Sequence, residues 1–482
     1  MAGCGGSDRQ LGTVGFVEGF LGGVAADEPQ AALIGRDVLS AGGNAADAVV
    51  AMYFASAVTL PSAASLGGGG VCLGFDRSSG EVAALEFLAR SPAESGGDRP
   101  VAVPGNVRGF FAFHARFGRL RWSQLLAPAE NLARFGAPVS RALAHDLGAV
   151  RAALEAEPSV RRMFGVPVER RLVGEGDLLR QVELAAVVSR IRAEGGGAFY
   201  IGSIARQLVD GANAAGGRLS MDDLRRYAPE WRPTSRIPWG NRVVHFAPSP
   251  PAGGAVAAAM WAHLHDRRGY AGADPAARLG AVAEAGLAAR TTTGIGRANG
   301  ADWLENPSAA TFVAVDREGS AAVCAVTLNS LFGTGRAVPE LGIMLAAAPG
   351  PGGRGATALG PMLVVNENVR EFFFAGAAAG GAAAPSALIQ VAADTLIAGE
   401  RLSQALAASR VLGGPMPGVV HAEPGAAVAA RSIVAAAGRR LASVPELGRV
   451  NAVACPDGLP PRPESCAAGH DPRGRGLATM AD

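Results

Sequence analysis

The chain alternates between stretches with helical periodicity and short paired stretches typical of strands, and this order limits the folds it can adopt. Residues 28–58 place small and apolar side chains at helical spacing with a break at Gly42-Gly43, which predicts two packed helices joined by a glycine turn. Residues 62–87 then predict a glycine loop and a hairpin that turns at residues 78–80.

The later part of the chain repeats this alternation. Residues 107–230 carry mainly helical patterns, and paired strands are predicted from Thr311 onward, with a second hairpin turning at residues 366–368. A helix from Pro385 and a tail of strands and turns follow. Two sets of paired strands separated by helices favour the α+β class, with a sandwich of sheets covered by helices. The absence of a long polar linker or an internal repeat indicates one folding unit.

Bulk properties exclude some classes of protein. The chain has 482 residues, of which 49% are hydrophobic, so it can bury a large core. Lysine and arginine number 44 against 42 acidic residues, and this balance provides no field to attract nucleic acid. No apolar run is long enough and free enough of charge to predict a transmembrane helix.

The first residues resemble a lipidation site. Ala2-Gly3-Cys4 followed by glycines is typical of a bacterial lipoprotein after its signal, although small residues also precede a cysteine by chance in a chain rich in alanine and glycine. A lipid anchor at Cys4 would place the protein in the periplasm or on a membrane if a signal preceded it. Without a signal we expect a cytoplasmic protein.

The other cysteines bear on the compartment in which the protein resides. Cys455 and Cys466 flank a proline-rich turn that can bring them within disulfide range, whereas Cys72 and Cys324 lie in apolar segments with strand character. An oxidising compartment is compatible with this pattern. No spacing typical of a zinc site is present, so we expect no metal.

Several motifs occur in the order found in gamma-glutamyltranspeptidases, which the chain resembles over nearly its whole length. The motifs are GGNAADAVVA at 42–51, LPSAASLGGGGVCLGFD at 60–76, VPGNVRGFF at 103–111, GGAFYIGSIA at 196–205, PSPPAGG at 248–254, VTLNSLFGTG at 326–335, GAAAGG at 376–381 and HDPRG at 470–474. A glycine loop alone is usually only a tight turn, so the resemblance depends on the shared order of the motifs.

The resemblance implies a four-layer αββα sandwich of the N-terminal-nucleophile (Ntn) hydrolase type. A precursor of this family cuts itself, and the freed residue attacks gamma-glutamyl or related amides without metal or organic cofactor. The implied cut lies before residue 309. It divides a large-subunit-like region, 1–308, from a small-subunit-like region, 309–482, which together form one globular unit and pair as a heterodimer if cleaved.

The family nucleophile position reads as alanine here. It lies seven residues before the aspartate that ends the first strand of the hairpin, and counting back from Asp316 gives Ala309. Alanine has no atom that can attack a carbonyl. Three readings stay open: Ser308 or Thr311 serves through a shift of register, the chain is an inactive variant of an enzyme, or it is an uncleaved family member with a binding role.

The resemblance also implies roles for residues around the nucleophile. Thr327 and Asn329 match the family's threonine and asparagine, of which the first bonds the nucleophile and the second holds the substrate's amino group. Gly380 and Gly381 match the paired glycines whose N–H groups stabilise the oxyanion. The alternatives are strand pairing for the first pair and a strand-to-helix turn for the second.

The substrate-binding motifs fit the family less well. The arginine that clamps the substrate carboxylate can only be Arg90, because the register position itself is Leu88. Thr357 and Ala358 align with two consecutive serines, and residues 346–355 replace the family's acidic lid. The ligand is therefore expected to be a small amide or peptide, and an acylase of different specificity is a further alternative.

Overall fold

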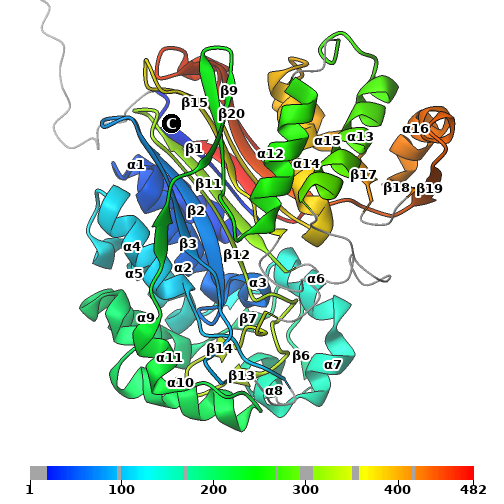
Figure 1. The fold of residues 1–482 in the computed structure, drawn as a ribbon. Helices are drawn as coiled ribbons and strands as arrows, with labels where there is room; N and C mark the ends of the chain where they lie inside the picture. Colours follow the sequence, from blue (N-terminus) through cyan, green and yellow to red (C-terminus); the bar gives the residue numbers. More distant parts are fainter. Residues whose placement is uncertain are drawn as a thin grey trace, which may run out of the picture.

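Two antiparallel sheets lie face to face, and helices cover both outer faces (Figure 1). The computed structural model describes residues 19–94, 99–166, 169, 171–265, 269–293, 308–349, 358–414 and 418–481. Contacts of β11 and β12 with β16 join the two sheets, while α2 packs on the first sheet and α14 on the second. The expected α+β class and αββα layering are confirmed.

Strands from distant parts of the chain make up each sheet. The first sheet has the order β22-β1-β11-β12-β2-β3-β8 and the second β21-β20-β16-β15-β10-β9. The first consists of β22 (Leu477–Ala481), β1 (Gly22–Ala26), β11 (Ala310–Asp316), β12 (Ala321–Thr327), β2 (Gly69–Asp76), β3 (Glu81–Phe87) and β8 (Glu230–Arg232). The second consists of β21 (Ala467–His470), β20 (Arg449–Leu459), β16 (Glu371–Ala379), β15 (Met362–Asn366), β10 (Arg242–Phe246) and β9 (Ser235–Trp239).

The helices fall into two groups by the sheet they cover. On the side of the first sheet are α1 (Pro29–Ser40), α2 (Ala45–Thr59), α3 (Pro61–Ala64), α4 (Asn106–Phe117), α5 (Trp122–Phe135), α6 (Arg141–Ala149), α7 (Arg151–Ala156), α8 (Pro158–Phe164), α9 (Val182–Glu194), α10 (Gly202–Ala214) and α11 (Met221–Arg226). On the side of the second are α12 (Ala252–His265), α13 (Pro275–Thr293), α14 (Ala384–Leu396), α15 (Leu402–Ala407) and α16 (Pro424–Ala436).

Short strands outside the two large sheets form four small sheets among the described residues. They are β4 (Ala137–Pro138) with β7 (Leu178–Leu179), β5 (Gly165–Val166) with β6 (Arg171–Leu172), β13 (Ala337–Val338) with β14 (Ile343–Met344), and β17 (Val411–Gly413) with β18 (Val419–Ala422) and β19 (Arg440–Ser443). No helix in the described ranges is both long and apolar enough to span a bilayer.

The helix pair expected from residues 28–58 forms as α1 and α2. Asn44 caps α2 by accepting from the Asp47 N–H, and Asp47 accepts from the Asn44 N–H in return. Every residue of α2 is buried, because the helix lies between α1, α5 and the first sheet. A side chain at Gly35 of α1 would come within 2.6 Å of Met52, so glycine permits the close approach of the two helices.

Both expected hairpins are confirmed, as β11–β12 around Asp316 and as β15–β16 around residues 366–368. The hairpin at 69–87 forms as β2–β3. The prediction of only strands and turns near the C-terminus is wrong, because α16 spans Pro424–Ala436. Its run of alanines has high helix propensity but too little apolar periodicity to distinguish it from the surrounding loops.

The boundary expected at residue 309 does not separate two spatial domains. The first sheet takes β1, β2, β3 and β8 from before this position and β11, β12 and β22 from after it. The second sheet likewise combines β9 and β10 with β15, β16, β20 and β21. Two chains produced by a cut there would remain joined through both sheets, as one globular unit.

Two disulfides cross-link the strands. Cys455 and Cys466 are bonded across the proline-rich turn, as the sequence suggested. Cys72 of β2 and Cys324 of β12 are also bonded, and they are directly opposite each other in the antiparallel ladder. Local sequence patterns do not predict the second bond, because only the strand register brings residues 252 positions apart into contact.

Candidate functional site

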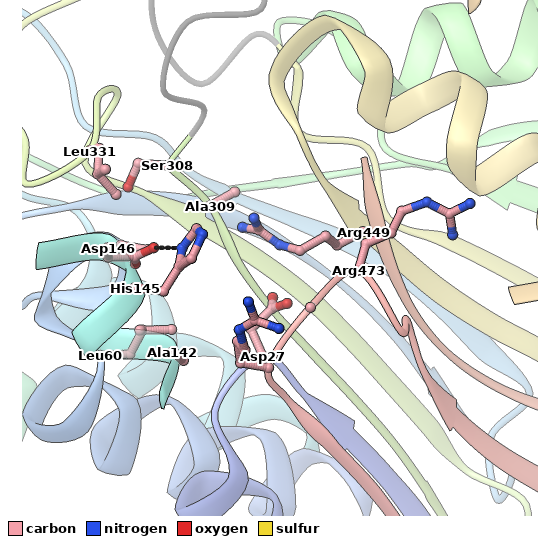
Figure 2. A pocket seen from close by; sticks show the side chains of 13 residues that line it. Asp27, Leu60, Ala142, His145, Asp146, Ser308, Ala309, Leu331, Arg449 and Arg473 are labelled. Carbon is pink, nitrogen blue, oxygen red and sulfur yellow. Dashed lines mark ion pairs between the residues drawn. The ribbon is translucent and has the colours of Figure 1, made fainter. Parts of the chain in front are cut away.

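A pocket opens where strands of the two sheets end beside α3 and α6 (Figure 2). Ala309, just before β11, lies on its wall with 8% of its surface exposed. The residues that line it are Asp27, Leu60, Ala63, Ala142, His145, Asp146, Ser308, Ala309, Leu331, Arg449, Arg473, Gly474 and Arg475. The position that the sequence assigned to the nucleophile is therefore in a pocket with charged walls.

The peptide that joins residues 308 and 309 is held by hydrogen bonds on both sides. The Thr327 hydroxyl, at the end of β12, donates to the main-chain carbonyl of Ser308. The Ser308 hydroxyl donates to the carbonyl of Ser62 at 2.8 Å. Thr327 and Ser308 are both buried, so these bonds are shielded from water and fix the peptide in place.

Thr311, the other alternative nucleophile, lies inside the fold. Its N–H and hydroxyl both donate to Asp27, at 2.7 and 2.9 Å, and its hydroxyl accepts from the Asn451 amide at 2.7 Å. Burial raises the pKa of Asp27, while the charge of Arg449 and the bonds from Thr311 oppose that shift. Thr311 has no exposed surface, and its hydroxyl is occupied by these structural contacts.

The two glycines expected to form an oxyanion site follow β16 at the same end of the sandwich. Ala379, which precedes Gly380, pairs with Arg449 of the pocket wall. Gly380 and Gly381 have φ angles of 131° and 55°, and a side chain at Gly380 would lie 2.5 Å from the Gly448 Cα. Only glycine fits this turn, so the expected strand-to-helix turn is observed. Neither glycine is among the residues that line the pocket, and the oxyanion role stays a prediction.

Asn329 follows Thr327 in a tight loop. Its N–H donates to the Thr327 hydroxyl at 2.9 Å and its side-chain amide donates to the carbonyl of Ala347 at 2.7 Å. The buried Oδ1 atom of Asn329 has no hydrogen-bond partner among the residues that the structure describes. The residue adopts φ of 68°, a left-handed conformation that asparagine tolerates better than most side chains do.

Arg90 lies in a different pocket from Ala309. It forms ion pairs with Glu86 at 3.1 Å and Glu230 at 2.7 Å, and its guanidinium lies over the Tyr227 ring. Burial lowers the pKa of Arg90, but the bonds to Glu86 raise it, and the net shift is upward. The positive charge of Arg90 is therefore compensated by two carboxylates, and the residue lines a pocket of its own. Thr357 lies outside the described residues.

Six ionisable side chains in the pocket were not anticipated from the sequence: Asp27, His145, Asp146, Arg449, Arg473 and Arg475. His145 of α6 forms an ion pair with Asp146, which raises the pKa of its imidazole. Asp146 also accepts from the Ser62 hydroxyl at 2.6 Å. Arg473 lies in the motif HDPRG, but that motif did not indicate a place in the pocket. The other residues come from a helix, strand ends and a loop that only the fold brings together.

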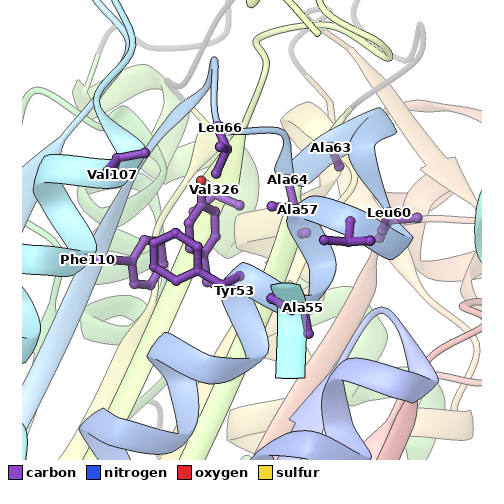
Figure 3. Packing of buried hydrophobic residues seen from close by; sticks show 14 of the residues in the cluster. Tyr53, Ala55, Ala57, Leu60, Ala63, Ala64, Leu66, Val107, Phe110 and Val326 are labelled. Carbon is purple, nitrogen blue, oxygen red and sulfur yellow. The ribbon is translucent and has the colours of Figure 1, made fainter. Parts of the chain in front are cut away.

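The wall formed by Leu60 and Ala63 belongs to the largest core cluster (Figure 3). In this cluster Tyr53 stacks on Phe110 with ring centroids 3.9 Å apart, and Val326 packs beside them just before Thr327. The position of Thr327 is thus set by close packing rather than by a flexible loop.

A double sheet covered by helices, with a pocket at the strand that starts beside position 309, defines the class of Ntn hydrolases. The family model for gamma-glutamyltranspeptidase matches residues 31–289 and 287–481. These ranges cover most of the sequence, so the chain belongs to the gamma-glutamyltranspeptidase family.

Individual relatives support this membership. Glutathione hydrolase 3 of Arabidopsis thaliana is 32% identical over 270 residues, which cover 53% of this chain but only 42% of the plant protein. The glutathione hydrolase proenzyme of Escherichia coli is 26% identical over 521 positions that cover 90% of this chain and 88% of its own. The structure of cephalosporin acylase from Bacillus halodurans has the same fold, with a TM-score of 0.78, 22% identity and coverage of 98% and 99%.

Proposed function

We propose that the chain carries the amide-cleaving site of a gamma-glutamyltranspeptidase-like hydrolase or acyltransferase, and that Ala309 keeps it in the uncut precursor form. In this family's chemistry the hydroxyl of residue 309 attacks the carbonyl of residue 308, the C–N bond breaks as the acyl group moves to oxygen, and water hydrolyses the resulting ester. The freed hydroxyl then accepts an acyl group from a gamma-glutamyl or related amide, while the new amino terminus takes up its proton. Alanine blocks the first step, so the natural chain binds its amide ligand without forming an acyl intermediate.

The bond from Thr327 to the Ser308 carbonyl carries this proposal. A hydroxyl aimed at a carbonyl oxygen polarises that carbonyl and stabilises the charge that develops on it during attack. The contact is made to the one peptide whose cleavage would free residue 309. The site therefore retains the parts that activate the peptide and lacks only the attacking group.

The alternative nucleophiles fit less well. Thr311 is buried beneath the pocket and held by Asp27 and Asn451. The Ser308 hydroxyl points to the Ser62 carbonyl, and the Ser308 carbonyl is itself the group that Thr327 contacts. For either residue to act, hydrogen bonds that hold the strand would first have to break.

Restoring the hydroxyl tests the proposal. We expect Ala309→Thr to cut itself before residue 309, giving two bands on a reducing denaturing gel, with an N-terminal threonine on the smaller fragment. Ala309→Val is the matched control, because valine has the shape of threonine without its hydroxyl, and we expect it to stay intact. A folded Ala309→Thr protein that is never cut would contradict the proposal. It would favour the alternative of an uncleaved family member with a binding role.

The specificity is proposed to differ from that of glutathione hydrolases. Arg90 is bound to Glu86 and Glu230 and lines another pocket, so the carboxylate clamp of the family has no counterpart at this position. Assays of the Ala309→Thr protein should therefore include acylase substrates beside gamma-glutamyl amides.

Export to an oxidising compartment is also part of the proposal. The disulfides Cys72–Cys324 and Cys455–Cys466 support it, because structural disulfides persist mainly in such compartments. The lipidation motif at Cys4 lies outside the described residues. Fractionation of a tagged full-length chain, with radiolabelled lipid to detect an anchor, tests both points.

A further inference from the structure

Three arginines line the pocket beside Ala309, but only one of them is held by ion pairs. Arg473 pairs with Glu423 at 2.5 Å and Asp471 at 3.1 Å, and it also donates to main-chain carbonyls. Arg449 and Arg475 form no ion pair and donate no side-chain hydrogen bond within the part of the chain that the structure describes. Arg449 is half-buried and Arg475 is exposed.

The acidic groups that face these arginines are already bound elsewhere. Asp27 accepts two hydrogen bonds from Thr311, and Arg449 acts on it only through its charge. Asp146 accepts from the Ser62 hydroxyl and pairs with His145. Arg449 and Arg475 therefore have guanidinium donors without an acceptor among the residues that the structure describes.

A guanidinium with free donors in a recess is suited to a carboxylate, which accepts two parallel hydrogen bonds from it. We propose that Arg449 and Arg475 bind the carboxylate of an amide ligand whose amide group lies at position 309. The ligand class is a small dicarboxylic acid monoamide. This inference rests on the proposed function, and it places anion recognition on the end of β20 and the β21–β22 loop, away from Arg90.

Binding can be measured on the chain as it exists, because Ala309 does not hydrolyse the ligand. The probe is glutaramate, the monoamide of glutarate, titrated by calorimetry at low salt. Pentanamide is the matched neutral ligand, since it keeps the amide and the chain length but lacks the carboxylate. We expect glutaramate to bind at least tenfold more tightly, the size of a charge-assisted hydrogen bond. Equal affinity for the two would overturn the proposal.

Variants assign the effect to the two side chains. Arg449→Gln and Arg475→Gln should each weaken glutaramate binding about tenfold and leave pentanamide binding unchanged. Arg449→Lys should restore part of the affinity, because it keeps the charge without the planar fork. Arg206→Gln, at an exposed arginine of α10, is the control and should bind as the natural chain does.

The outcomes separate this inference from the proposed function. If Ala309→Thr is cut while the glutamine variants bind glutaramate normally, the anion site is wrong and the hydrolase site stands. If Ala309→Thr is never cut while both glutamine variants lose binding, the anion site stands and the hydrolase site is wrong. Circular dichroism of each variant shows whether a loss of binding comes from loss of fold.

Discussion

The hydroxyl of Thr327 donates a hydrogen bond to the main-chain carbonyl of Ser308, so the last residue of β12 holds the peptide that joins residues 308 and 309. β12 pairs with β11 on one side and β2 on the other, which fixes Thr327 relative to the start of β11. A side chain at Gly68 would come within 2.5 Å of the Thr327 carbonyl, so glycine there keeps the backbone close. The peptide is thus placed by the sheet itself.

This contact predicts that the Thr327 hydroxyl accelerates self-cleavage before residue 309 once a nucleophile is present. In the Ala309→Thr background, Thr327→Val should slow self-cleavage about a hundredfold, the effect of removing one donor from a developing oxyanion. Thr327→Ser keeps the hydroxyl and should retain most of the rate. The rate is measured from the loss of the full-length band after purification in denaturant and refolding. Equal rates for the valine and serine variants would rule out this role.

The disulfide between Cys72 and Cys324 predicts how a cut chain behaves. Cys72 precedes position 309 and Cys324 follows it, so the bond links the two products covalently. We expect the cut Ala309→Thr protein to run as one full-size band without reductant and as two bands with it. The double variant Cys72→Ala, Cys324→Ala should give two bands in both conditions. Two bands from the unreduced parent would contradict the linkage.

The architecture could be predicted because each layer has its own local signal. The glycine break at 42–43 predicted α1 and α2, and the turns at Asp316 and Asn366 predicted two hairpins. Local patterns do not report which hairpin joins which sheet. The pairing of β1 with β11 and β22 therefore became visible only in the structure.

The site was predictable only where residues follow one another in a motif. Thr327 was assigned from VTLN, and its hydroxyl donates to the main-chain carbonyl of Ser308. Arg449, Arg475 and His145 come from separate elements with no shared spacing, so only the folded chain reveals them as neighbours. Arg90 was chosen by its place in the sequence, and its acidic partner Glu230 is far along the chain.

Thr311 is expected to stabilise the fold rather than to act in cleavage. Thr311→Val removes the hydroxyl that Asp27 and Asn451 share, which leaves buried polar groups without a partner and should lower the free energy of unfolding by about 1–3 kcal/mol. Thr479→Val on β22 is the control, because its hydroxyl donates to the neighbouring Met480 carbonyl and to no other group in the described part of the chain. It should change stability by less than about 0.5 kcal/mol. Urea unfolding measures both.

The same variant addresses the chemistry. In the Ala309→Thr background, Thr311→Val should leave the site of the cut unchanged. If the natural chain were cut before residue 311, and Thr311→Val abolished that cut, Thr311 would be the nucleophile instead.

Asp316 predicts a pH dependence of stability. Burial raises the pKa of this carboxyl to about 7, although the N–H groups of Ala45 and Ser320 donate to it and oppose the shift. Between about pH 4 and pH 7 the folded state therefore binds more protons at this site than the unfolded state does. Its contribution to the free energy of unfolding is largest at low pH and falls as the pH rises, by at most about 1.4 kcal/mol per pH unit.

Asp316→Asn removes this titration, so the free energy of unfolding should fall less steeply as the pH rises. Asparagine can accept from only one of the two N–H groups, so the variant is also less stable at every pH. Asp76 provides the matched control, since it ends β2 as Asp316 ends β11. Burial raises the pKa of Asp76, but hydrogen bonds from Ser79 and Ser78 outweigh it and lower the pKa overall, so its contribution is lost only as the pH falls below about 4. Urea unfolding of the natural chain and both variants between about pH 4.5 and pH 7.5 should therefore show a converging difference for Asp316→Asn and a constant difference for Asp76→Asn. Parallel curves for the natural chain and Asp316→Asn would mean that the buried carboxyl stays ionised throughout, held by the N–H groups of Ala45 and Ser320.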